Sequence, residues 1–173
     1  MNGGLMAFLI LSVIKLRYRP ALIAIGWFLA LLLTSCAAVQ PERLSQYRNT
    51  RYGFEFAYPS RWQPIPPPDN FDGQAFQDPD SPETEIRGWA RQILPKQPKD
   101  PLKLNFTTDQ GLQGELQTEI GREISTLTLT LRQGAIQYIW QARSPNDRFA
   151  EQYRLFYNIA RQYRVFLEVE NSP

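Results

Sequence analysis

The chain has 173 residues, with 19 lysines and arginines against 17 aspartates and glutamates, one cysteine and no histidine. This composition excludes an intrachain disulfide, a Cys/His zinc site, and the Ser-His-Asp and Cys-His catalytic arrangements. Residues 1–35 hold three basic and no acidic residues, so without them the net charge changes from +2 to −1. A nearly neutral domain lacks the concentrated basic face that nucleic acids need, and we expect no nucleic-acid partner.

Residues 1–35 are predicted to be an export signal. A basic patch precedes an uncharged apolar run, and two small residues then lead to the cysteine, which is the order typical of a secretory signal. The residues concerned are Lys15, Arg17, Arg19, the run 21–33, Thr34, Ser35 and Cys36. The Leu-Thr-Ser-Cys ending resembles the lipobox of bacterial lipoproteins, which implies that Cys36 is acylated and becomes the new N-terminus.

An uncleaved membrane anchor is the main alternative for this segment, because 21–39 is uncharged and close to the ~20 residues that span a bilayer. An ordinary buried cysteine is the third interpretation of Cys36. The lipoprotein and the anchor share one consequence, since the basic patch stays cytoplasmic and the rest of the chain lies outside. Residues 36–48 are predicted to be a lipidated cysteine and linker of at most ~40 Å, which keeps the domain near the membrane.

Residues 49–173 are predicted to form one domain rich in antiparallel strands. Alternating apolar and polar residues, bounded by glycine or proline, mark each strand. In one strand threonines alternate with leucines, which predicts leucines facing the core and threonines facing solvent. The expected strands are 53–58, 74–77, 84–93, 112–120, 124–133 and 135–143, with two proline-rich loops at 64–68 and 95–101.

A helix is expected at the end of the domain. Ser144 offers an N-cap hydroxyl, Pro145 suits the first helical position and Asp147 places an acid in the first turn. An apolar stripe follows at helical spacing. Its members are Phe149, Tyr153, Phe156, Ala160 and Tyr163, widened by Leu155 and Ile159. The predicted fold is therefore α+β, a twisted antiparallel sheet of about six strands backed by a C-terminal helix.

The segment Tyr52–Trp62, with sequence YGFEFAYPSRW, resembles the opening of PsbP-like domains, which begin with a Tyr-Gly-Phe strand, Tyr-Pro and a nearby tryptophan. The resemblance spans most of 52–164. It implies a cyanobacterial lipoprotein that faces the periplasm or thylakoid lumen and associates with photosystem II or its assembly. The chain departs from the family in two ways: the metal-binding histidines of some relatives have no counterpart, and prolines interrupt 94–101, where many relatives are helical.

Four aspartates lie around the first proline-rich loop, namely Asp69, Asp72, Asp78 and Asp80. Carboxylate clusters hold Ca²⁺ in many proteins, yet this spacing matches no EF-hand loop, and solvated loop acids are the favoured interpretation. No cofactor other than this possible Ca²⁺ is expected. An alternative function follows, an envelope lipoprotein that binds a small ligand or ion with this loop as its mouth.

A second group of charges could dock an acidic partner or lipid headgroups. Its members are Arg87, Arg91, Lys96, Lys99 and Lys103. Nearby acids dilute the cluster, so a solvated face is the favoured interpretation. Trp62 and Trp89 are interpreted as core or loop anchors rather than as ligand-stacking residues.

Two carboxylate pairs, Glu83 with Glu85 and Glu115 with Glu119, have the composition of acid/base pairs, but exposed strand charges are far commoner. With histidine and a catalytic cysteine absent, we expect no enzyme. The leading hypothesis is a lipid-anchored interaction module that presents a sheet face and loops to a membrane complex.

Overall fold

The computed structural model describes residues 42–94 and 101–166, and the chain divides into two units, Met1–Pro41 and Glu42–Pro173. The predicted export signal, Cys36, Lys96 and Lys99 lie outside the described residues. Over the part that is described, no helix combines the length and apolar character needed to cross a membrane.

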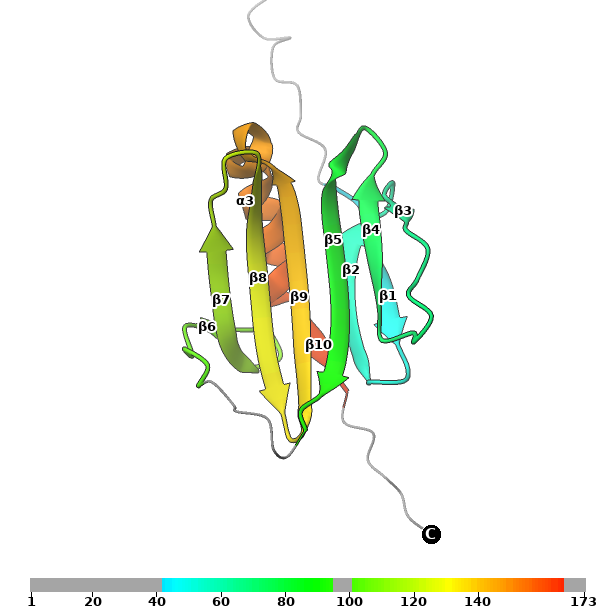
Figure 1. Ribbon diagram of the computed structural model, residues 1–173, viewed down its shortest axis with the longest axis vertical. Coiled ribbons are helices and arrows are strands. Elements are labelled where there is room, and N and C mark those ends of the chain that lie inside the picture. The colour runs from blue at the N-terminus through cyan, green and yellow to red at the C-terminus, as the bar shows by residue number, and fades with distance from the viewer. Residues whose placement is uncertain (1–41, 95–100, 167–173) are drawn as a thin grey trace, which may run out of the picture. The chain divides into compact units, whose positions relative to one another are not determined.

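The described residues form two antiparallel sheets and one helix, α3 (Figure 1). The larger sheet has seven strands in the order β3-β4-β5-β9-β8-β7-β6, and the smaller has three in the order β1-β2-β10. The bounds are β1 Leu44–Asn49, β2 Phe54–Pro59, β3 Gln63–Pro64, β4 Gly73–Asp78, β5 Ser81–Gln92, β6 Phe106–Thr107, β7 Gln113–Glu119, β8 Ile124–Gln133, β9 Ile136–Pro145, α3 Asn146–Arg161 and β10 Arg164–Val165.

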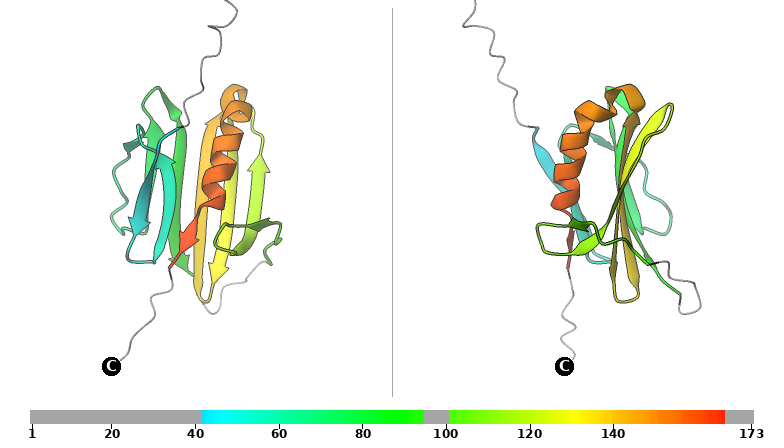
Figure 2. Two further views of the ribbon diagram at one scale, coloured as in Figure 1. Left: turned by 180° about the vertical axis from the view of Figure 1, so that it is seen from behind. Right: turned by 90° about the vertical axis from the view of Figure 1, so that its left-hand side faces the viewer.

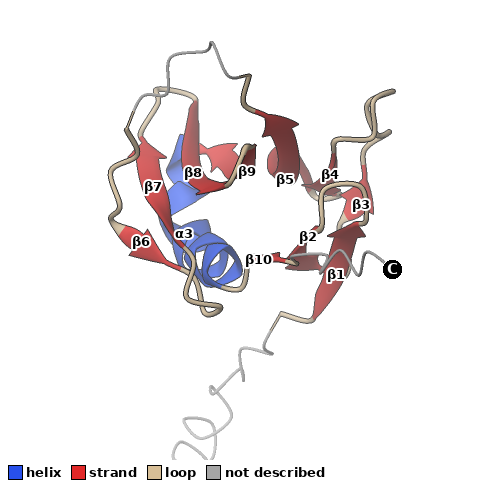
Figure 3. Ribbon diagram, turned by 90° about the horizontal axis from the view of Figure 1, so that it is seen from below, coloured by secondary structure: helices blue, strands red, loops and turns tan. Residues whose placement is uncertain are grey.

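The unit that begins at Glu42 has two layers. The seven-stranded sheet is one layer, and α3 lies beside the three-stranded sheet in the other, both on the same face of the larger sheet (Figures 2 and 3). We call this covered side the inner face. The opposite side, the outer face, is covered by no helix among the described residues (Figure 2).

The core between the layers is aromatic. Phe54 and Phe56 of β2 are fully buried, and their rings stack on that of Tyr163, which follows α3, with centroids 5.8 Å and 6.5 Å away. Trp140 of β9 is fully buried as well. Leucines of β8 complete the core from the larger sheet, and Leu127, Leu129 and Leu131 are at most 3% exposed. The expected orientation of the leucines is confirmed.

The predicted strands match β2, β4, β5, β7, β8 and β9, but a single sheet of about six strands is wrong. The chain makes two sheets, because β2 pairs with β1 and β10 rather than with its successors. Strand β1 also occupies the last part of the predicted linker 36–48. It is an edge strand with exposed Leu44, Gln46 and Arg48, so its alternation carries little apolar signal.

The helix begins one residue later than expected, at Asn146 instead of Pro145. Ser144 belongs to β9, is fully buried, and donates from its hydroxyl to the carbonyl of Pro145 at 3.3 Å. Pro145 takes the N-cap position, with no side-chain cap, and Asp147 lies in the first turn as predicted. The stripe packs on the larger sheet through Phe149, Phe156 and Ala160, whereas Tyr153 is 37% exposed.

Candidate functional site

The predicted aspartate cluster separates into two groups at opposite ends of β4. Asp78 ends the strand and Asp80 follows it, whereas Asp69 and Asp72 precede it. A six-residue strand is ~20 Å long, so the two groups do not share one cation-sized site. The carboxylate of Asp72 accepts a hydrogen bond from Asn70 Nδ2 at 2.7 Å, and Asp69 is exposed.

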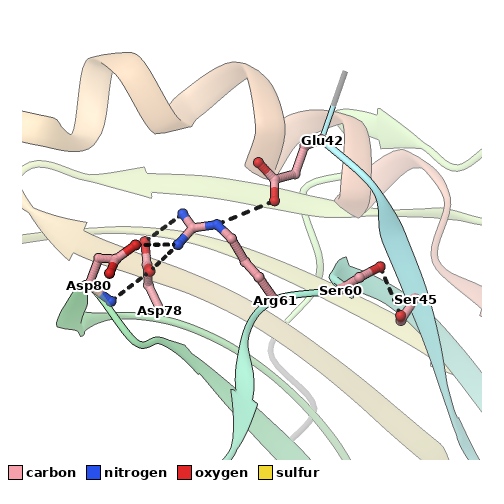
Figure 4. Close-up of polar contacts among 6 residues, drawn as sticks. All are labelled: Glu42, Ser45, Ser60, Arg61, Asp78 and Asp80. Atoms are coloured by element: carbon pink, nitrogen blue, oxygen red, sulfur yellow. Dashed lines mark hydrogen bonds and ion pairs between the residues drawn. The ribbon is translucent and has the colours of Figure 1, made fainter. Parts of the chain in front are cut away.

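Arg61 links the second group of acids (Figure 4). Its Nη1 donates to Asp78 Oδ1 at 2.7 Å and to Asp80 Oδ2 at 2.8 Å, and its Nη2 donates to Asp78 Oδ2 at 3.1 Å. Glu42 lies on the other side of the guanidinium, with Oε1 3.5 Å from Nε. The hydrogen bond to Asp78, more than the neighbouring charges, raises the pKa of Arg61 above its ordinary value. We call these four residues the Arg61 cluster.

The Arg61 cluster supplies its own cation. The Asp78 side chain is 4% exposed and accepts two charge-assisted hydrogen bonds from a guanidinium that stays protonated at all accessible pH values. A metal ion would have to displace Arg61 from these carboxylates. Across the described ranges 42–94 and 101–166, no group of three or more His, Cys, Asp or Glu side chains is arranged to hold a metal.

A second buried carboxylate lies on the outer face of the larger sheet. Glu85 of β5 is 2% exposed, pairs with Arg87 two residues along the strand, and accepts a hydrogen bond from Arg143 Nη2 of β9 at 2.7 Å. The register places Glu85 directly opposite Arg143. Two guanidiniums therefore share one carboxylate, and this Arg87–Glu85–Arg143 group carries a net positive charge.

The outer face extends this pattern along β5 and β9. Residues that alternate with the buried core positions point outward, so Arg87, Trp89 and Arg91 share this face. Arg91 donates from Nε and Nη2 to Gln137 Oε1 at 3.1 Å and 2.9 Å. Of the predicted docking residues, Arg87 and Arg91 thus belong to one ordered face, and Lys103 is exposed before β6. The face also has a shallow pocket beside Trp89.

The structure separates the two tryptophans that the sequence treated alike. Trp62 is 4% exposed and belongs to the core, whereas Trp89 is half-buried and lines the outer-face pocket. The carboxylate pairs also differ, because Glu85 is bound by arginines while Glu83 is exposed. Glu115 and Glu119 of β7 lie on the outer side of that strand, opposite Thr130 and Thr126.

Sequence reasoning missed Arg61 and Arg143. Arg61 lies inside the Tyr52–Trp62 segment, and its position one residue before a buried tryptophan was a usable signal. Arg143 lies two residues after Gln141 on β9, so the side chains of both residues point to the outer face of the sheet. Its contact with Glu85, 58 residues earlier in the chain, follows only from the pairing register of β5 and β9.

Comparisons with known proteins give a likeness of structure. No family model matches the chain, and no curated protein matches it. The solution structure of cyanobacterial PsbP from Synechocystis sp. PCC 6803 is similar, with a TM-score of 0.46 and 19% identity over 76% of this chain and 98% of that one. A 1.50 Å crystal structure from Bacteroides thetaiotaomicron VPI-5482 is similar with a TM-score of 0.53 and 15% identity. That match covers 74% of this chain and half of the other, so the chain shares the fold of one part of that protein.

Proposed function

We propose that the chain is a non-enzymatic, lipid-anchored interaction module of the PsbP-like kind, which works outside the cytoplasm and associates with photosystem II or its assembly. The outer face of the larger sheet carries the proposal. It is an ordered surface with a net positive Arg87–Glu85–Arg143 group, and no described helix covers it. The Tyr52–Trp62 resemblance supports the assignment to a photosynthetic membrane, and three aromatic residues of this segment, Phe54, Phe56 and Trp62, belong to the core of the domain.

An ordered charged face suits a docking role. Glu85 fixes two arginines at one position, so little side-chain entropy remains to be lost when an acidic surface binds. Such contacts raise association rates and weaken with salt. A module of this kind needs no catalytic group.

Co-purification from native membranes tests the partner. We expect the tagged protein, solubilised in mild detergent, to recover photosystem II subunits, and recovery to fall about tenfold in Arg87→Glu, because a reversed charge opposes an acidic partner. Arg154→Glu is the matched control, because this exposed arginine lies on α3, away from the outer face. Recovery of membrane complexes without any photosynthetic subunit would reject the photosystem assignment.

Labelled palmitate tests the anchor separately. We expect incorporation into the wild-type protein, none into Cys36→Ala, and loss of that variant from the membrane fraction. Each buried methylene contributes ~0.8 kcal/mol, so two or three acyl chains hold the protein firmly. If Cys36→Ala stays in the membrane fraction, the segment 21–39 acts as an uncleaved anchor instead.

A further inference from the structure

A pocket of about 420 Å³ opens on the outer face, between β4, β5 and the loop that joins β3 to β4. The register pairs Gly73 with Trp89 and Ala75 with Arg87, and these positions alternate with the buried Phe76 and Ile86. The loop stands on the side of the sheet opposite α3 (Figure 2). The walls include Ile65, Pro66, Pro68, Asp72, Arg87 and Trp89. The alternative sequence hypothesis expected a mouth at this loop, and the pocket lies against it.

Hydrogen bonds fix the loop that forms the far wall. Ile65 N donates to Ala75 O at 2.9 Å, and Gln74 Nε2 donates to Ile65 O at 2.6 Å. At the other end, Phe71 N donates to Pro68 O at 3.0 Å. Prolines 66–68 fix their own φ angles and restrict the residues before them. The wall is therefore formed before any ligand arrives, which lowers the entropy lost on binding.

The loop also holds a strained residue. Phe71 is 65% exposed and has φ +49°, a backbone conformation that is strained for a bulky side chain. Asn49 Nδ2 donates to Phe71 O at 3.2 Å and keeps this turn in place. Strain of this kind persists where the surrounding structure enforces it, and it is frequent at binding sites.

The wall chemistry selects the ligand. The pocket lies within the ~300–1,000 Å³ range of small-molecule sites, and Trp89 with Ile65 and the prolines gives it apolar walls. An indole favours a planar ring against it. Arg87 and Asp72 bring opposite charges to the pocket lining, at different positions along it, because Arg87 lies opposite Ala75 whereas Asp72 precedes Gly73. Arg87 belongs to the Arg87–Glu85–Arg143 group, which carries a net positive charge. An anionic substituent is therefore favoured at the Arg87 end.

We propose that this pocket binds a small planar apolar molecule that carries one anionic group. The ring lies against Trp89 and the prolines, and the anion faces Arg87. This activity goes beyond the proposed docking role, since it requires neither the membrane nor a partner complex.

Isothermal titration of the full chain in dodecylmaltoside micelles, with naphthalene-2-sulfonate as the probe, tests the proposal. We expect saturable binding at one site, weakened about tenfold in Trp89→Ala and about fivefold in Arg87→Gln, because each removes one of the two contacts. Trp89→Phe keeps a ring and should stay within about threefold of wild type. Arg154→Gln is the matched control for Arg87→Gln, and its affinity should equal that of wild type.

Two further probes separate the ring from the charge. Methanesulfonate lacks the ring and 2-naphthylmethylammonium reverses the charge, so both should bind at least tenfold more weakly. Unsaturable heat, equal affinity in Trp89→Ala, or tighter binding of the ammonium probe would each overturn the proposal. Circular dichroism of every variant checks that the domain is folded. If Trp89→Ala or Arg87→Gln unfolds the domain, the conservative variants Trp89→Phe and Arg87→Lys still test the two contacts.

Discussion

Two nearly buried carboxylates in this domain, Asp78 and Glu85, are both bound by arginines. A guanidinium suits this role because it is planar, donates from several nitrogens and remains charged. Asp78 uses one arginine that also reaches two exposed acids, whereas Glu85 uses two arginines. The Arg61 cluster therefore carries a net negative charge, whereas the Arg87–Glu85–Arg143 group carries a net positive charge. Residue chemistry alone therefore assigns a structural role to the Arg61 cluster and a surface role to Glu85.

Glu85→Gln should destabilise the domain by about 1–3 kcal/mol. The amide keeps the shape but removes the charge that holds two arginines side by side. The cost is below that of a fully buried ion pair, since both arginine side chains are 40% exposed. Urea unfolding followed by circular dichroism measures the change. Glu83→Gln, two residues away, is the control. An equal loss of stability in Glu83→Gln would show that the ion pairs of Glu85 with Arg87 and Arg143 contribute nothing specific to the stability of the domain.

Tyr163→Phe should stabilise the domain by about 1 kcal/mol at neutral pH. The Tyr163 ring is fully buried, and its hydroxyl has no hydrogen-bond partner among the described residues. Burial also raises the pKa of this phenol well above 10.0, with smaller contributions from Tyr138 and Tyr47. Thermal unfolding of both proteins at pH 7 gives the comparison, and a lower midpoint for Tyr163→Phe would contradict it.

The same residue sets a pH dependence with a definite sign. A raised pKa means that the folded state holds its proton after the unfolded state has lost it. The stability from neutral Tyr163 is complete below pH ~10 and declines as pH rises through the unfolded pKa towards the folded one. We expect the wild type to lose more stability than Tyr163→Phe between pH 9 and pH 11, and parallel curves would contradict this.

At the scale of elements, local patterns predicted the strands whose own residues specify them. Strand β8 was predicted with its observed ends because leucine and threonine alternate along it, and α3 because its stripe has helical spacing. Strands β3, β6 and β10 have two residues each and exist only through their partners. No local pattern specifies an element that short. The division into two sheets depends on the pairing of β2 with β1 and β10, which the pattern of each strand alone does not specify either.

The candidate site shows the same limit. Arg87 and Arg91 were grouped as possible docking residues of one predicted strand, whereas Trp89 was interpreted as a core or loop anchor, so the face that the three residues share was not predicted. The Glu85 contact required the β5–β9 register, and the pocket required β4 beside β5 with the proline-rich loop folded over them. The Glu85–Arg143 contact and the pocket were therefore not predicted, because both depend on pairing between strands that are far apart in the sequence.

Gly88→Ala should destabilise the domain by about 1–3 kcal/mol through the contact between the two sheets. A Cβ at this position of β5 would lie 2.5 Å from Phe56 Cε1 and 2.7 Å from Cδ1, on the central strand of the smaller sheet. A double-mutant cycle with Phe56→Leu measures the coupling. We expect the double variant to lose less than the sum of the single changes, whereas strict additivity would indicate that the clash is relieved elsewhere.

For the whole molecule, β1 changes the relation between the domain and its expected anchor. The linker was predicted to run from Cys36 to residue 48, but β1 begins at Leu44 and the compact unit at Glu42. If Cys36 is lipidated as proposed, five residues lie between it and Glu42, and the chain between them reaches at most ~20 Å instead of ~40 Å. Arg61 then binds the chain through Glu42 just where the tether joins the domain.

A variant that begins at Asn49, the predicted domain boundary, should therefore be less stable by at least ~3 kcal/mol than one that begins at Glu42. It loses the ladder between β1 and β2 and the Tyr47 ring, whose centroid lies 5.3 Å from Phe56 and 6.0 Å from Phe76. Urea midpoints of the two variants measure the loss. Tyr47→Ala in the longer variant isolates the ring, for which we expect ~2 kcal/mol. Equal urea midpoints for the variants that begin at Asn49 and at Glu42 would mean that β1 is a docked linker rather than part of the folding unit. The linker from Cys36 would then extend to residue 48, with a reach of at most ~40 Å.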